Sequence, residues 1–256
     1  MNAPARWRLG GRDGVTLIEL LIAISLLSLL SVGMLMALRV GLSALDKANS
    51  KLIANRRAAS VQQILASQIA GLMPVFADCP SNQPDGRPIR VPFFEGQPQA
   101  MRFVSTYSLQ EAARGYPRIL EFQTIPGDPS VGGFRLIVNE SLYSGPLSVG
   151  ASCLGLFADP NLGNAVLPQY RPIEAGPNSF VLADRLAFCR ISYKERLPPQ
   201  APESWLTEWR RPRLPAAVRV EMAPLVADPS RAPLAGVTVP IYVSRMPNVR
   251  YTDSFN

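Results

Sequence analysis

The sequence places one carboxylate inside an otherwise uncharged apolar stretch. Residues 15–37 contain a single charged side chain, that of Glu19. Roughly 20 apolar residues are needed to cross the hydrocarbon core of a bilayer, and no later stretch of this chain approaches that length. An intramembrane carboxylate is costly and is rarely left without a partner. The sequence therefore predicts one N-terminal membrane span that carries a functional acid.

The residues before the span indicate its orientation. Arg6, Arg8 and Arg12 outnumber Asp13, so we expect residues 1–14 to stay in the cytoplasm and the rest of the chain to lie across the membrane. A cleaved secretory signal peptide is one alternative, although its apolar region is shorter than this one. A plain signal anchor is another. Neither alternative gives Glu19 a partner.

Cleavage within the leader would provide that partner. If the chain is cut between Gly14 and Val15, the new amino group lies four residues, about one helical turn, from Glu19. The two groups carry opposite charges. Glu19 is then expected to pair with its own N-terminus or with that of a neighbouring copy.

The stretch "GVTLIELLIAISLLSLL" resembles the N-terminal processing motif of the type IV prepilin family. The resemblance implies that a membrane-bound prepilin peptidase cleaves after Gly14 and methylates the new N-terminus at Val15. It also implies that Glu19 registers one subunit against the next. Val15 departs from the phenylalanine or methionine that is usual at the first mature position.

The apolar run continues into a predicted amphipathic helix. Leucines recur at helical spacing beyond Arg39, and polar and charged residues lie between them. No proline interrupts residues 15–73, so we expect the helix to stop at Pro74. Its transmembrane half is residues 15–38 and its amphipathic half residues 39–74, with possible bends at Gly33 and Gly41.

Residues 75–256 are predicted to form a β-rich domain in the periplasm. Prolines from 74 to 98 predict an irregular connection. Six runs that resemble strands follow: "MRFVSTY", "RILEFQTI", "FRLIVNES", "RLAFCRISY", "AAVRVEM" and "GVTVPIYVS". The stretches "PGDPSVGG" and "CLGLFADPNLG" are predicted as loops. The fold class is α+β, a pilin-like fold in which one long helix packs on a mostly antiparallel sheet.

The late sequence resembles the J-type minor pseudopilin of type II secretion. The stretch "SFVLADRLAFCRISYKER…WLTEWRRPRLPAAVRVEM" carries this likeness. Its matching residues are Asp184, Arg185, Leu186, Phe188, Tyr193, Trp205, Trp209, Leu214, Pro215, Val218 and Val220. Residues 75–180 match only in having strands.

This resemblance implies a structural subunit at the tip of a periplasmic pseudopilus, anchored in the bacterial inner membrane by residues 15–38. The implied partners are I-, K- and H-like pseudopilins, the major pseudopilin, the prepilin peptidase and the inner-membrane assembly platform. A W-like minor pilin of a type IV pilus, with a role in priming, adhesion or DNA uptake, remains an alternative. A membrane-tethered binding module or enzyme is another.

Catalytic chemistry has little support in the residue types. The chain has no histidine, which removes the commonest general base and most mixed metal sites. No nucleotide-binding or hydrolase motif is present. We therefore expect no enzyme activity, no catalytic residues, no metal site and no cofactor.

The three cysteines allow one disulfide in an oxidising compartment. Cys79 and Cys153 both lie in sequence that is typical of loops and are the favoured pair. Another pairing, or none, remains open. Cys189 alternates with Ala187, Ile191 and Tyr193 in a predicted strand, which favours a buried free thiol.

The net charge of +7 includes +2 from the leader, so the mature chain carries +5. The cluster "EWRRPR" combines Trp209 with Arg210, Arg211 and Arg213, as a nucleic-acid patch would. The cluster is short and broken by a proline. A solvated loop is therefore favoured, contact with an acidic neighbouring subunit is an alternative, and nucleic acid is not expected as a partner.

Overall fold

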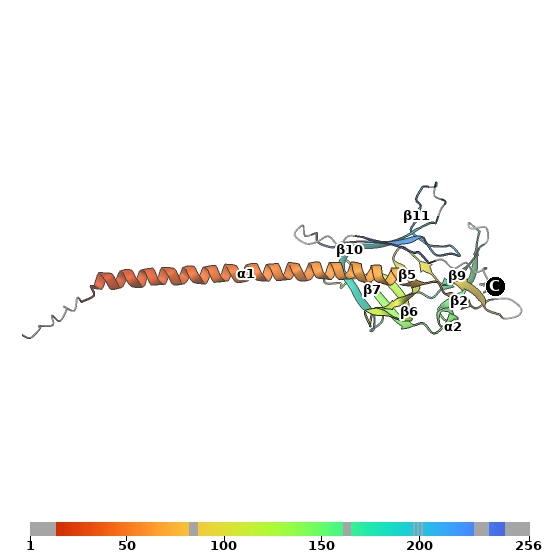
Figure 1. The fold of residues 1–256 in the computed structure, drawn as a ribbon, viewed down its shortest axis with the longest axis horizontal. Coiled ribbons are helices and arrows are strands. Elements are labelled where there is room, and N and C mark those ends of the chain that lie inside the picture. The colour runs from red at the N-terminus through yellow and green to blue at the C-terminus, as the bar shows by residue number, and fades with distance from the viewer. Residues whose placement is uncertain are drawn as a thin grey trace, which may run out of the picture. The chain divides into compact units, whose positions relative to one another are not determined.

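The computed structural model describes residues 14–81, 87–160, 165–196, 198, 200, 202–227 and 236–243. The chain divides into two compact units, and the boundary falls after Ile53, within the first helix. This helix, α1 (Leu17–Ala70), is followed by antiparallel strands and a short helix, α2 (Pro146–Gly150) (Figure 1). The predicted α+β architecture is confirmed.

Helix α1 is continuous through Gly33 and Gly41 but ends earlier than predicted. The sequence analysis extended it to Met73 and stopped it at Pro74, whereas its last residue is Ala70. The amphipathic half predicted as 39–74 is therefore shorter.

Pairing with the sheet ends the helix. The Gly71 N–H donates to the Ser67 carbonyl at 2.9 Å, and the Gly71 carbonyl accepts a bond from the Thr106 N–H at 2.8 Å. The next two residues form β1 (Leu72–Met73), which pairs with Ser105 and Val104. A Cβ at Gly71 would lie 2.7 Å from the Ser105 hydroxyl, so the close approach favours glycine there.

One large antiparallel sheet forms the body of the domain. Its order is β1, β5 (Ala100–Ser108), β6 (Ala113–Pro126), β7 (Phe134–Leu142), β10 (Phe180–Lys194), β12 (Ala217–Pro224) and β13 (Val237–Pro240). Two short strands extend it, because β4 (Glu95–Gly96) pairs with β5 and β11 (Trp205–Leu206) pairs with β10. The six predicted strand runs correspond to β5, β6, β7, β10, β12 and β13.

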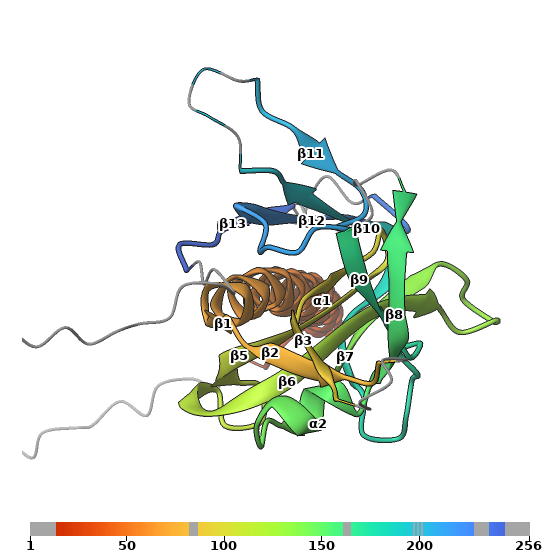
Figure 2. The same ribbon diagram turned by 90° about the vertical axis from the view of Figure 1, so that its right-hand side faces the viewer.

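Strand β10 joins the two halves of this sheet. Its residues from Phe180 to Leu186 pair with β7, and those from Leu186 to Lys194 pair with β12. Register shifts interrupt the pairing around Leu186, and Arg185 there has a positive φ of 54°. Such bulges bend a strand and increase its twist. Viewed end-on, the C-terminal part of α1 lies between β5, β6 and β7 on one side and β10, β12 and β13 on the other (Figure 2).

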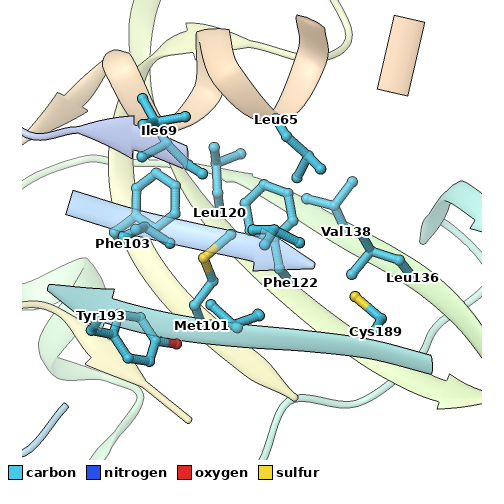
Figure 3. Packing of buried hydrophobic residues seen from close by; sticks show 14 of the residues in the cluster. Leu65, Ile69, Met101, Phe103, Leu120, Phe122, Leu136, Val138, Cys189 and Tyr193 are labelled. Carbon is cyan, nitrogen blue, oxygen red and sulfur yellow. The ribbon is translucent and has the colours of Figure 1, made fainter. Parts of the chain in front are cut away.

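The main hydrophobic core fills the space between α1 and the two halves of the sheet. Leu65 and Ile69 of α1 are fully buried. Figure 3 shows them with side chains from both halves: Met101, Phe103, Leu120, Phe122, Leu136, Val138, Cys189 and Tyr193. Burial of this aliphatic and aromatic surface is what holds the end of α1 on the sheet.

A second, smaller core lies on the other face of β5 and β6, where Val104 and Ile119 are buried. The elements that pack there are β2 (Phe76–Cys79), β3 (Ile89–Pro92), α2, β8 (Cys153–Asp159) and β9 (Ala165–Tyr170). The predicted irregular connection from 74 to 98 was therefore wrong, because it contains β2, β3 and β4. The loop predicted at "CLGLFADPNLG" was also wrong, because its first seven residues form β8.

Candidate processing and assembly site

The predicted cleavage point lies in exposed, non-helical backbone. Gly14, Val15 and Thr16 precede the first residue of α1, and all three are exposed. A Cβ placed on Gly14 would meet no atom within 4 Å. A peptidase can reach the Gly14–Val15 bond without unwinding any turn of the helix. The leader before Gly14 lies outside the described residues.

Thr16 caps the N-terminus of α1, a role that the sequence analysis missed. The Glu19 N–H donates to the Thr16 hydroxyl at 3.3 Å, and the Leu20 N–H donates to the Thr16 carbonyl at 3.2 Å. The pattern Thr16-Leu-Ile-Glu19 is that of a capping box, in which the side chains at the two ends satisfy backbone donors at the start of a helix. This spacing was visible in the sequence. Thr16 and Glu19 both lie on the mature side of the predicted cut.

Glu19 is exposed in the first turn of α1, where a negative charge interacts favourably with the helix dipole. Within the part of the chain that the structure describes, its carboxylate forms no ion pair. In the uncut chain the nitrogen of Val15 is a peptide nitrogen and carries no charge. The pairing of Glu19 with a processed N-terminus therefore stays a prediction.

The structure joins Cys79 and Cys153 in a disulfide with a Cα–Cα distance of 5.5 Å. Both residues lie in strands and not in loops, at the end of β2 and the start of β8. Both are buried, and a Cβ at the neighbouring Gly150 would collide with the Asp78 carbonyl. The bond therefore crosses a closely packed contact between β2 and the segment after α2. Cys189 is buried and unpaired.

A buried arginine links the sheet to the β8–β9 hairpin, and sequence reasoning missed it. Arg102 on β5 is 1% exposed. It donates to Glu121 and Glu95, each at 2.8 Å, and to the Arg171 carbonyl at 2.8 Å. Its guanidinium also lies 5.6 Å from the ring centre of Tyr170. Desolvation raises the pKa of Glu95, and the charge of Arg102 opposes that shift.

The arginines of the "EWRRPR" cluster are paired within the chain. Arg211 and Arg213 contact the Glu195 carboxylate at 3.2 and 3.1 Å. Arg210 contacts Glu208 at 2.8 Å. Trp209 is buried and donates from its indole nitrogen to the Arg213 carbonyl at 2.6 Å. The cluster therefore closes a loop around a buried tryptophan. The predicted interpretation as a solvated loop holds for Arg210 and Arg213, which are exposed, but not for Trp209 or for the partly buried Arg211.

Two further observations concern chemistry and the membrane. Among the described residues, no three histidine, cysteine, aspartate or glutamate side chains gather where they could hold a metal ion. Helix α1 contains a stretch that is long and apolar enough to cross a bilayer. That stretch is exposed throughout.

Comparison with known proteins identifies the N-terminal region. Residues 11–35 match the family model described as the prokaryotic N-terminal methylation motif. The match includes Gly14, Val15, Thr16 and Glu19, and it extends into the apolar part of α1. Neither a curated protein nor a solved structure matches the chain. The chain therefore carries a type IV prepilin-like leader, and the match does not extend to the β-rich domain.

Proposed function

We propose that this chain, which carries the prokaryotic N-terminal methylation motif, is a type IV pilin-like protein and, within that class, a J-like minor pseudopilin of type II secretion. In this role it is a structural subunit and not an enzyme. It joins I-, K- and H-like pseudopilins at the tip of a periplasmic pseudopilus and helps to start assembly of the filament. The observation that carries the pilin-like class is the motif match over residues 11–35.

The geometry around the cut supports processing. The Gly14–Val15 bond is exposed and lies outside α1, whereas the helix cap at Thr16 lies beyond it. Removal of the leader therefore leaves the capped helix intact. The new amino group at Val15 then lies close in sequence to Glu19, which among the described residues has no ion-pair partner.

Several features support a single-pass protein of the inner membrane with its domain in the periplasm. Residues 15–38 are exposed and apolar, and the basic leader favours a cytoplasmic N-terminus. The Cys79–Cys153 disulfide is typical of an oxidising compartment.

The J-like assignment rests on the late sequence. Two of its matching residues, Tyr193 and Trp209, are buried in the main core with their ring centres 6.4 Å apart. The Tyr193 hydroxyl donates to the Gln97 carbonyl at 2.9 Å. The two aromatic residues therefore lie at the junction of β4, β10 and the loop that precedes β12.

Intact mass tests the processing step. The full chain is expressed with a prepilin peptidase, and we expect a mature product that begins at Val15 and carries one added methyl group. Gly14→Glu is expected to leave the leader in place. Gly10→Glu, which makes the same substitution elsewhere in the leader, serves as the matched control and should be cleaved normally. Normal cleavage of the Gly14→Glu variant would contradict the proposed site.

Incorporation into a filament tests the role of Glu19. We expect Glu19→Leu to insert in the membrane normally but to dock poorly with neighbouring subunits. Asp46→Leu removes an acid from the same helix outside the apolar run and is the matched control. Equal incorporation of both variants would count against the pairing of Glu19 with a processed N-terminus.

Co-purification tests the J-like assignment. The full chain is extracted in detergent from membranes that also contain the I- and K-like pseudopilins of the same genome. A stable ternary complex would support the tip-complex role. No complex among folded partners would favour a W-like minor pilin, and pilus assembly in a deletion strain would then be the deciding assay.

A further inference from the structure

An apolar stripe continues along α1 beyond the membrane span. Leu38, Leu42, Leu45 and Leu52 recur at helical spacing and are between 49% and 61% exposed. At 3.6 residues per turn these four side chains lie along one face of the helix, which Asn49 interrupts between Leu45 and Leu52. Exposed leucines that form one stripe indicate a surface that is covered by something else. We call residues 38–53 the juxtamembrane segment.

The opposite face of the juxtamembrane segment carries two lysines beside the exposed Val40. Lys47 and Lys51 are one helical turn apart and point away from the leucine stripe, and Arg39 lies at its flank. Asp46 is the one acid in the segment, so its net charge is +2. Within the described part of the chain, none of the three basic side chains forms an ion pair.

We propose that the juxtamembrane segment docks on the periplasmic surface of the bilayer, with its leucines at the boundary of the acyl chains and its basic side chains among anionic lipid headgroups. A helix with one apolar face and a polar face rich in lysine and arginine is suited to lie in that interface. The segment also follows the apolar run directly in sequence, so it begins at the membrane surface. The inference uses the membrane anchoring in the proposed function but not the filament role.

Charge favours an anionic lipid surface over a second copy of the same segment as the partner of the juxtamembrane segment. Two copies packed through their leucines would bring together two segments that each carry +2, whereas an anionic headgroup layer complements that charge. The attraction acts on the lysines because they are exposed and have no acidic partner among the described residues.

Docking requires α1 to bend just beyond the span. The helix is continuous there in the structure, and Gly41 and Ser43 mark the place where the bend would form. Gly41 has no atom within 4 Å of the position of a Cβ. Two residues later, the Ser43 hydroxyl donates to the Val40 carbonyl at 2.9 Å. Glycine and serine pairs, and hydroxyls that bond to the preceding turn, are common causes of helix bending. At about 1.5 Å per residue, a straight helix would carry Leu52 roughly 20 Å beyond the apolar run.

Site-specific labelling of the full chain in vesicles tests the proposal. Single cysteines are introduced by Leu52→Cys on the apolar stripe and Ser50→Cys on the polar face, and each is coupled to an environment-sensitive dye. Cys79 and Cys153 are bonded and Cys189 is buried, so a Cys189→Ala background leaves the introduced thiol as the reactive one. Leu27→Cys within the apolar run reports insertion of the span.

We expect the Leu52 label to be buried and the Ser50 label to stay in water when the vesicles contain phosphatidylglycerol. Lys47→Gln with Lys51→Gln should weaken docking of the Leu52 label roughly 30-fold in those vesicles, since each basic residue near an anionic surface contributes about five-fold. The same double variant should have little effect in vesicles of phosphatidylcholine alone.

When the Leu27 label shows that the span is inserted, two results would overturn the inference. One is a water-exposed label at both Leu52 and Ser50 in anionic vesicles. The other is burial of the Leu52 label that depends on protein concentration and not on lipid charge, which would indicate docking between copies. A Leu27 label that stays in water would instead overturn the membrane anchoring, and with it the inference. The two failures are therefore distinguishable.

Discussion

Removing the Cys79–Cys153 disulfide is expected to destabilise the β-rich domain strongly. The two residues are 74 positions apart, so the bond closes a long loop in the unfolded chain. In the chain-entropy model a loop of this length contributes about 4.5 kcal/mol to the free energy of unfolding. Natural domains have a total stability of only about 5–15 kcal/mol. Cys79→Ala with Cys153→Ala should therefore remove a large part of it.

The assay is urea unfolding of the full chain in detergent, followed by far-UV circular dichroism and by tryptophan fluorescence. Trp209 is buried beside Tyr193 and reports the main core. The matched control is Cys189→Ala, which removes a buried thiol without breaking a disulfide and should cost only about 1 kcal/mol.

A reducing agent provides the second arm of this test. It should destabilise the wild type and the Cys189→Ala variant, and it should leave the double alanine variant unchanged. The reasoning is refuted if the double variant unfolds within about 1 kcal/mol of the wild type, because the calculated contribution is several times larger.

Three further predictions concern single buried positions. Gln68→Leu should raise the free energy of unfolding by roughly 1–3 kcal/mol, because Gln68 is buried and both polar atoms of its side chain lack a partner among the described residues. A urea midpoint below that of the wild type would contradict this. Gly96→Ala should lower the free energy of unfolding by roughly 1–3 kcal/mol, because the new Cβ would lie 2.6 Å from Tyr193 Cζ and 2.8 Å from Trp209 Cβ. An unchanged melting temperature would show that the two aromatic side chains can move apart. Glu95→Gln should become more stable relative to the wild type as the pH rises above 4.5. Burial raises the pKa of Glu95, so the folded wild type binds the proton more tightly than the unfolded chain and its free energy of unfolding falls as that proton is lost. Parallel curves of unfolding free energy against pH for the two proteins would argue against that shift.

The N-terminal site was largely predictable because its signals are local. The apolar run, the position of Gly14 and the spacing from Val15 to Glu19 can all be read within a few turns of helix. The capping role of Thr16 was equally predictable, because it follows from the same short pattern.

The β-rich domain was predictable where a strand shows a run of β-branched and aromatic residues, and not where prolines and glycines surround the strand. Strands β5, β6 and β7 show runs of β-branched and aromatic residues, and the sequence analysis found them. Strands β2 and β8 are flanked by prolines and glycines, which predict turns and loops, although each pairs with the next strand along the chain, β3 and β9. Cys79 and Cys153 were consequently placed in loops. The burial of Arg102 had no sequence signal, because arginine is mostly exposed and its acids come from two other strands.

The sequence by itself determined that the chain has a prepilin-like leader, an apolar stretch long enough to cross a membrane and a long helix that continues from it. These features follow from hydropathy, helical periodicity and the spacing of neighbouring residues, which act over a few turns. Only the tertiary structure decided where α1 ends, which cysteines form the disulfide and which acids pair with the buried Arg102. Each of these depends on contacts between residues far apart in the chain, and such contacts form only when burial in the two cores offsets the entropy of closing the intervening loops.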